Sequence, residues 1–288
     1  MTERVKLLLG TLLISAIIIV IAIFSKSTAD SGNQLKIYFL DVGQGDSEYI
    51  KMPDGSDILI DGGPDDKVLS ELGKVMSFGD HKIDLVVLTH PHADHITGLV
   101  DVISRYDIGE VWESGAEYPS TIYNAFKSEI KNKNIKDKFP VAGEEKDLNN
   151  SKILFKVLYP LSSEKNKTID NLNNASLVTE LDFNKFTTLF TGDLEKTVQP
   201  QIYNELRAVT VLKVAHHGST NGTDGNLLQI LRPAIAVIEV GEKNNYGHPA
   251  PSIISLLKSY AVQIYRTDQN GTVEIVSDGN GYSVKTNQ

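Results

Sequence analysis

Residues 85–99, LVVLTHPHADHITGL, place three histidines and an aspartate within six positions, directly after an apolar run. His90 and His92 are two positions apart, so their side chains point the same way at the extended end of a strand. Asp94 and His95 follow in the turn at which the chain bends into a helix. Imidazole and carboxylate groups without a thiolate suit zinc, manganese or iron. The stretch therefore predicts a metal site, with enough ligands to serve two ions side by side.

The chain contains no cysteine, so it has no disulfide, thiolate ligand or cysteine nucleophile, and further ligands must be histidines or carboxylates. Asp193 follows the apolar segment FTTLFTG at another strand end, where it either binds metal or caps a helix that starts at the next residue. His216 and His217 end the segment LKVAHH, and His248 lies in a loop ahead of a helix. The remaining histidine, His81, is expected at the surface.

The amino terminus predicts export or membrane anchoring. Two basic residues precede residues 7–24, LLLGTLLISAIIIVIAIF, which carry no charge and are just long enough to span a bilayer as a helix. Ser27 and Ala29 suit a small-residue cleavage site, so residues 1–29 are expected to be a signal peptide or a membrane anchor, with the length favouring the anchor. The basic flank stays inside, which makes the rest of the chain extracytoplasmic.

Strand-like and helix-like segments alternate from residue 35 onward, which predicts one α/β domain over residues 35–286. Residues 267–285 are expected to form a final hairpin with Asn-Gly and Asp-Gly turns, and the polar residues 127–150 and 162–174 to be surface excursions. Strands are expected at residues 35–41, 56–61, 84–90, 151–159, 176–183, 186–193, 209–217, 234–241 and 262–267, and helices at 66–78, 95–106, 119–132, 195–207, 222–231 and 251–260.

The motifs HPHADH, LFTGD and IDGG resemble those of the metallo-β-lactamase superfamily. A fuller set, FLDVGQGDS, LTHPHADHITGL, NNASLVTEL, LFTGDLE, LKVAHHGST, NNYGHPAPS and YRTDQNGTV, resembles the extracytoplasmic hydrolase domain of ComEC-type DNA-uptake (competence) proteins over residues 35–277. The resemblance implies an αββα sandwich of two mixed β-sheets, here preceded by an N-terminal hydrophobic helix. It also implies a metal-dependent hydrolase with two divalent metal ions, Zn or Mn.

The sequence departs from the superfamily between His95 and Asp193, where no histidine supplies the usual metal ligand and the segment NLNNASLV stands instead. The pair His216 and His217 is the expected substitute, with His216 preferred because neighbouring side chains at a strand end face opposite ways. If neither binds metal, an oxygen of Asn173 or Asn174, or a water, takes that position. The expected assignment puts His90, His92 and His216 on one ion and Asp94, His95 and His248 on the other, with Asp193 bridging both.

Other polar residues in these motifs are expected around the ions. Asp61 in IDGG is expected to orient a ligand histidine, although a turn aspartate is the alternative. The glycine-flanked loop DVGQGDS either lines the cleft or is an ordinary tight turn between strands. The cleft candidates in that loop are Asp41, Gln44 and Asp46, while His217 and Ser219 are expected to contact substrate oxygens.

Two cations about 3.5–4 Å apart activate a shared water as a bridging hydroxide and stabilise the attacking and leaving oxygens. This chemistry, with Asp94 and His217 as catalytic candidates, predicts a phosphodiesterase or nuclease outside the cytoplasm, acting on a phosphodiester and, by the resemblance, on DNA. The net charge of −9 disfavours a broad nucleic-acid-binding surface. Hydrolysis of a lactam, thioester or carboxylic ester at the same site remains an alternative, as does a non-catalytic DNA-binding module.

Overall fold

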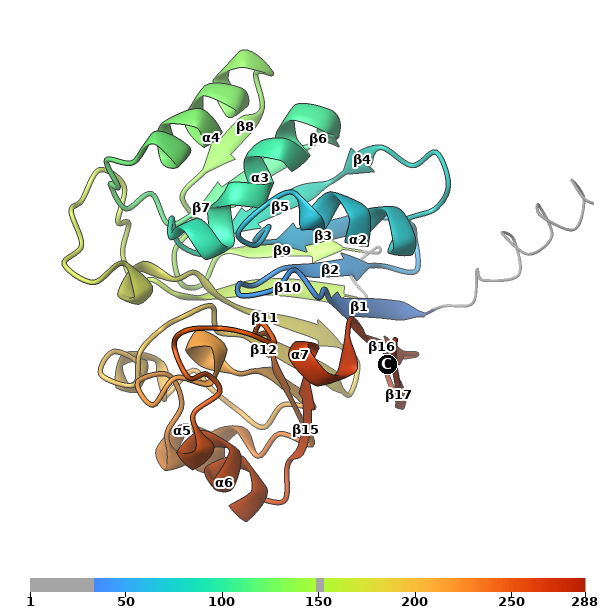
Figure 1. The fold of residues 1–288 in the computed structure, drawn as a ribbon, viewed down its shortest axis with the longest axis vertical. Helices are drawn as coiled ribbons and strands as arrows, with labels where there is room; N and C mark the ends of the chain where they lie inside the picture. The colour runs from blue at the N-terminus through green and yellow to red at the C-terminus, as the bar shows by residue number, and fades with distance from the viewer. Residues whose placement is uncertain (1–33, 149–152, 288) are drawn as a thin grey trace, which may run out of the picture.

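The computed structural model describes residues 34–148 and 153–287, and two mixed β-sheets lie at its centre (Figure 1). In this part of the chain the first sheet has eight strands, in the order β17 (Tyr282–Thr286), β16 (Val273–Ser277), β1 (Leu35–Phe39), β2 (Glu48–Lys51), β3 (Asp57–Ile60), β5 (Leu85–Leu88), β7 (Glu110–Glu113) and β8 (Lys136–Lys138). The second has seven, in the order β15 (Gln263–Arg266), β14 (Ile235–Ile238), β13 (Val211–Lys213), β12 (Phe186–Phe190), β11 (Val178–Phe183), β10 (Ile153–Tyr159) and β9 (Glu145–Leu148).

Helices cover the outer faces of both sheets (Figure 1). Helices α2 (Lys67–Val75), α3 (Ala93–Arg105) and α4 (Thr121–Asn132) pack on the first sheet, and α5 (Gly225–Leu231) and α6 (Pro251–Ser259) pack on the second. The expected α/β architecture is therefore confirmed. The remaining described elements are the strand pair β4 (Lys82–Ile83) and β6 (Asp107–Ile108), the short helix α7 (Thr267–Asn270), and the 3-10 turns η1 (Leu172–Ala175), η2 (Gln199–Ile202) and η3 (Ala215–Gly218).

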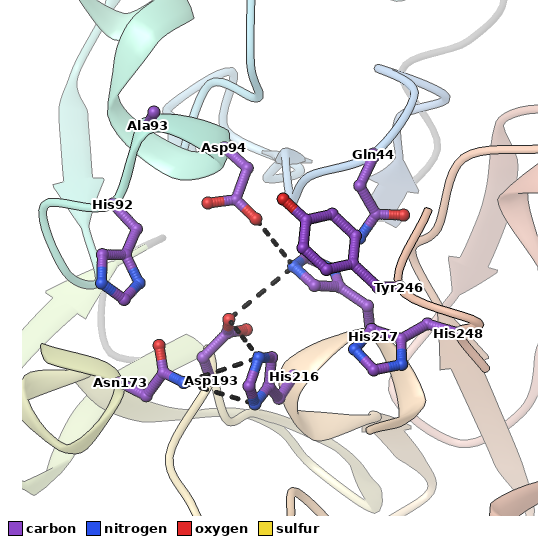
Figure 2. Close-up of a pocket in the computed structure, with 10 residues that line it drawn as sticks. All are labelled: Gln44, His92, Ala93, Asp94, Asn173, Asp193, His216, His217, Tyr246 and His248. Atoms are coloured by element: carbon purple, nitrogen blue, oxygen red, sulfur yellow. Dashed lines mark hydrogen bonds and ion pairs between the residues drawn. The ribbon is translucent and has the colours of Figure 1, made fainter. Parts of the chain in front are cut away.

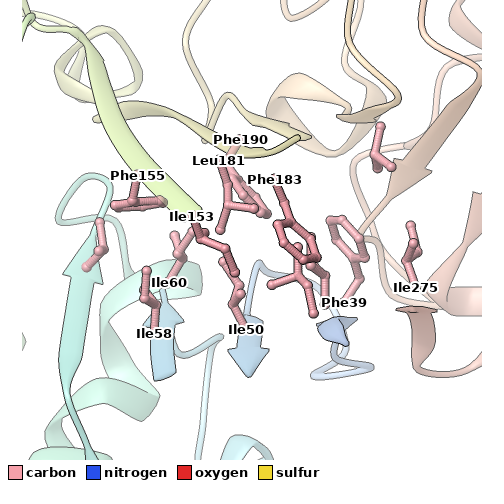
Figure 3. Packing of buried hydrophobic residues seen from close by; sticks show 14 of the residues in the cluster. Phe39, Ile50, Ile58, Ile60, Ile153, Phe155, Leu181, Phe183, Phe190 and Ile275 are labelled. Atoms are coloured by element: carbon pink, nitrogen blue, oxygen red, sulfur yellow. The ribbon is translucent and has the colours of Figure 1, made fainter. Parts of the chain in front are cut away.

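The largest core lies between the two sheets, because alternate residues of each strand point inward. Phe39 and Ile50 of the first sheet face Phe155 and Phe183 of the second, as Figure 3 shows. All four side chains are fully buried. Each such burial contributes about 1.5–3 kcal/mol, so this layer fixes how the two sheets sit against each other.

The parallel strands bring several chain turns to one edge of the sandwich. Strands β3, β5 and β7 are mutually parallel in the first sheet, and β12 to β15 are parallel in the second. Residues that follow the carboxyl ends of these strands meet at that edge, which is where open α/β sheets place their ligands. The motifs that contain His90, Asp193 and His216 follow such ends.

Three expectations about local structure are wrong. Residues 127–150 are not only surface excursions, because they contain the edge strands β8 and β9, whose charged sequences KDK and EKDL suit sheet edges. Residues 195–207 form no α-helix, and only the 3-10 turn η2, with Pro200 in its first turn, occurs there. Asn270 and Gly271 end helix α7 instead of forming a hairpin turn, although β16 and β17 do form the expected final hairpin.

The predicted signal peptide or anchor, residues 1–29, lies outside the described residues. Among residues 34–148 and 153–287, none of the helices has both the length and the apolar character needed to cross a membrane.

Candidate metal centre

A pocket of about 300 Å³ opens at the edge where the parallel strands end (Figure 2). Its lining combines residues from loops that follow strands of both sheets, from the start of α3 and from the loop ahead of α6. The residues that line it are Gln44, His92, Ala93, Asp94, Asn173, Asp193, His216, His217, Tyr246 and His248.

His90 and His92 follow strand β5, as the sequence predicts. His90 is fully buried, and its Nε2 lies 3.0 Å from Nδ1 of His92. The other ring nitrogen of His90 lies 3.1 Å from the hydroxyl of Thr89 and 3.4 Å from that of Ser176. These two hydroxyls hold the ring so that its Nε2 faces the pocket side.

Helix α3 begins at Ala93, which puts Asp94 and His95 in its first turn. Nδ1 of His95 lies 2.7 Å from Oδ2 of Asp61, a fully buried carboxylate just after β3. This contact leaves the buried Nε2 of His95 to face the site, where it has no hydrogen-bond partner. The Asp61 carboxylate also accepts hydrogen bonds from the backbone N–H and the hydroxyl of Thr89, so it links the strand end to the helix start.

Asp193 lies at the centre of the cluster, just after β12. Its backbone N–H donates to the hydroxyl of Ser176, and no α-helix follows it, so the helix-cap alternative has no helix to cap. Gly192 before it has a φ of 48°, and a Cβ there would approach Thr89 and Ser176 to about 3.1 Å or less. The Asp193 Oδ2 atom lies within 4 Å of four imidazole Nε2 atoms, at 3.4 Å from His95, 3.7 Å from His217, and 3.9 Å from both His90 and His216.

His216 and His217 lie beyond the end of β13, in the turn η3, and both have left-handed backbone angles, with φ of 52° and 51°. His217 is buried, and its Nδ1 lies 2.9 Å from the carbonyl oxygen of Glu239. Its Nε2 lies 3.2 Å from Oδ2 of Asp94. His217, and not His248, therefore lies with Asp94 and His95.

His248 lies on the other side of the pocket, with its ring centroid 5.7 Å from that of His216. Asn173 of η1 also contacts His216, because its Nδ2 lies 3.3 Å from the Nδ1 of that ring. The Oδ1 of Asn173 is buried without a hydrogen-bond partner. Thus the segment NLNNASLV, which stands where a ligand histidine was expected, reaches the pocket through Asn173.

Lys213, the last residue of β13, was not among the residues expected at the site. It is fully buried beneath the pocket, pairs with Asp46, and lies 3.9 Å from Oδ1 of Asp193. Burial lowers the Lys213 pKa, but Asp46 and Asp193 outweigh this effect and raise it above its ordinary value. Its position within the apolar run VTVLKVA indicates a buried lysine, and a lysine is rarely buried unless a carboxylate pairs with it.

The cluster has the electrostatic character of a cation site. Burial raises the pKa of Asp193, but His217 and His95 outweigh it and hold that pKa well below its ordinary value. Burial lowers the pKa of His217, yet Asp193 and Asp46 raise it to about 10. Buried carboxylates that stabilise positive charge fit divalent metal ions bound by imidazole and carboxylate groups, as do His95 Nε2 and Asp193 Oδ1, which make no hydrogen bond.

The remaining candidates lie in several places. Gln44 lines the pocket and accepts a hydrogen bond from the N–H of Gly241. Asp41 lies away from the lining residues and pairs with Lys67 at 3.0 Å, while the hydroxyl of Ser219 accepts from the N–H of Asn221. His81 is exposed at the surface, as predicted.

The sequence matches known proteins over most of its length. The profile described as "Metallo-beta-lactamase superfamily" matches residues 40–241. The chain is 29% identical to ComE operon protein 3 of Bacillus subtilis, covering 83% of this chain and 32% of that protein. It is 27% identical to Recombination protein 2 of Haemophilus influenzae, covering 82% and 28%. The chain thus spans less than a third of the length of these relatives.

A solved structure shares the fold. CmlA of Streptomyces venezuelae, a diiron beta-hydroxylase, aligns with a TM-score of 0.54 at 13% identity, covering 82% of this chain and 53% of CmlA. At this identity the likeness concerns the arrangement of the sheets and helices alone.

Proposed function

This chain belongs to the metallo-β-lactamase superfamily, and we propose that it is a metal-dependent phosphodiesterase that binds two divalent ions, Zn or Mn. The position of Asp193 carries the proposal. One of its oxygens lies within 4 Å of imidazole nitrogens from two separate chain segments, residues 90–95 and residues 216–217, which is how a carboxylate shared by two ions is expected to lie.

We assign the ligands by the contacts of the pocket. Asp94, His95 and His217 form one group, since their ligand atoms all lie within 4.8 Å of one another. His90 and His92 form the other, which is completed by His216 or by Oδ1 of Asn173. Asp193 belongs to both groups. In this assignment His217 takes the ligand position that was first expected for His248.

Bound ions of this kind polarise a phosphoryl oxygen and activate a water for attack. The protein's own residues prepare the site for that chemistry. Asp61 holds Nδ1 of His95, and the Glu239 carbonyl holds Nδ1 of His217, so that each ring presents Nε2 to the pocket. The buried charge of Lys213 stabilises Asp46 and Asp193 beneath the site.

Two features support a phosphodiester substrate, and DNA in particular. One of the relatives is named Recombination protein 2, and recombination is a process of DNA. A pocket that gathers imidazoles and divalent ions also favours an anionic substrate over a neutral lactam or ester. The extracytoplasmic location, and a membrane contact through residues 7–24, remain predictions from the sequence.

We expect the purified chain to bind close to two equivalents of Zn or Mn and to cleave a generic phosphodiester only when they are bound. Metal analysis, followed by assays on single-stranded DNA, double-stranded DNA, a β-lactam and a thioester, measures both properties. A protein that binds no metal after reconstitution contradicts the site, and one that binds metal but cleaves only the lactam or thioester contradicts the substrate class.

The two neighbouring histidines are expected to differ in their effect on metal content. His217→Ala should lose the ion held by Asp94 and His95, because the Nε2 of His217 lies 3.2 Å from the Asp94 carboxylate. His216→Ala should keep that ion and weaken only the His90–His92 group. Titration of each variant with Zn measures the stoichiometry and the affinity of the remaining ion. Full retention of both ions in His217→Ala would contradict the assignment.

A further inference from the structure

Tyr246 is an exposed aromatic residue at the mouth of the pocket. Its relative exposure is 70%, one of the highest among the large hydrophobic side chains of the described residues, and it lines the same pocket as Asp94 and His217. Figure 2 shows its ring beside Gln44 and Asp94, on the side of the pocket that carries His248. Exposing a large ring in this way gives no stability to the fold.

The loop that carries Tyr246 is firmly held. The Asn244 side chain donates to the carbonyl oxygens of Gly241 and His248, at 3.0 and 2.8 Å. The same side chain accepts from the N–H groups of Tyr246 and His248, at 3.2 and 3.0 Å. Gln44 accepts from the N–H of Gly241 and so ties the loop to the first sheet. The ring position is therefore set before any ligand arrives.

The tyrosine ring has His248 stacked beside it and remains largely exposed to a ligand. The Tyr246 and His248 rings are stacked, with centroids 5.9 Å apart and planes 18° from parallel, and His248 in turn meets His216 edge to face. A planar group stacked on the exposed ring would lie at the mouth of the pocket that Asp94 and Asp193 line. Aromatic side chains stack well on nucleobases, and they do so for any base.

We propose that Tyr246 is a stacking platform for a nucleobase next to the scissile phosphodiester, and that the substrate is therefore single-stranded nucleic acid. This inference rests on the proposed function and adds the substrate's form. A base within a duplex is stacked on its neighbours and is not free to reach the ring, whereas the bases of a single strand are.

The test compares a single-stranded oligonucleotide with one of equal length whose bases are replaced by abasic sites. For the wild-type holoenzyme, KM should be lower for the normal strand, and Tyr246→Ala should raise that KM about 5- to 150-fold while leaving KM for the abasic strand unchanged. Tyr246→Phe should behave like wild type, since the phenyl ring stacks equally well. Tyr282→Ala, which removes another exposed tyrosine on the distant strand β17, is the matched control.

The metal content of Tyr246→Ala shows whether the substitution has also disturbed the neighbouring histidines. If only stacking is lost, the variant should retain both ions. Equal KM values for the two strands in the wild type, or an equal rise for both in Tyr246→Ala, would overturn the proposal. If the metal-loaded wild type cleaves no phosphodiester, the proposed function fails by itself. Fluorescence anisotropy with the same two oligonucleotides then still decides the stacking role, because binding does not require cleavage.

Discussion

Replacement of Asp193 by asparagine is expected to abolish hydrolysis and to leave the protein unable to hold its metal ions together. The Asp193 carboxylate is 2% exposed, and its Oδ2 is the atom that approaches all four Nε2 atoms of the surrounding histidines. An asparagine keeps the shape but removes the negative charge, so the two proposed ions would lose a shared ligand at once. Metal analysis and phosphodiesterase assays of the purified variant measure the two losses.

The matching variants show whether the loss is specific to a shared ligand. Asp61→Asn should be milder, about 10–100-fold in metal affinity or activity, because Asp61 acts through Nδ1 of His95. Asp101→Asn, on the exposed side of the same helix α3, should change neither quantity. Equally mild losses for Asp193→Asn and Asp61→Asn would contradict a bridging role.

The location of the site could be predicted from the sequence because local patterns determine it. An apolar strand followed by alternating histidines leads to His90 and His92 at a strand end, and the polar first turn of a helix leads to Asp94 and His95. The structure brings Asp193 to the same place by parallel pairing of β12 and β13. To predict these positions, it is enough to know that side chains alternate along a strand and that the ends of parallel strands meet at one edge of the sheet.

The directions in which the His216 and His217 side chains point could not be predicted, because they depend on backbone angles that the sequence does not reveal. The prediction assumed an extended backbone, in which neighbouring side chains alternate. Strand β13 ends at Lys213, and both histidines have φ near 50°. Alternation does not apply to such a turn, and His217 is the one that contacts Asp94. The position of Tyr246 at the pocket was missed for a similar reason, since the side chain of Asn244 fixes that loop.

The edge strands were missed because their polarity resembles that of a loop. Strands β8 and β9 carry mostly charged residues, and their backbones pair with the outer strands of the two sheets. Sheet edges favour such residues because charges prevent another chain from pairing there. A pattern of alternating apolar residues is therefore least informative at the edges of a sheet and most informative at its centre.

Lys213→Met is expected to lower the free energy of unfolding by about 3–5 kcal/mol, the cost of leaving a buried charge without its partner. The Lys213 and Asp46 side chains are 0% and 1% exposed, so water cannot replace the lost ammonium group. Lys213 also donates a 3.1 Å hydrogen bond to the carbonyl oxygen of Gly192, which holds the turn that carries Asp193. Urea unfolding in the presence of a chelator measures the change in the metal-free protein.

Two further variants assign that loss to the buried pair. Lys285→Met removes a lysine whose partner, Glu274, lies 3.3 Å away at the surface, and it should cost no more than about 1 kcal/mol, because water screens exposed pairs. Asp46→Asn added to Lys213→Met removes the carboxylate charge that has lost its lysine and keeps His217, whose Nδ1 lies 3.1 Å away. The double variant should therefore be more stable than the sum of the single losses predicts, by about 0.5–3 kcal/mol. Strictly additive losses would mean that Lys213 stabilises the fold by packing alone. They would contradict a stabilising ion pair between Lys213 and Asp46.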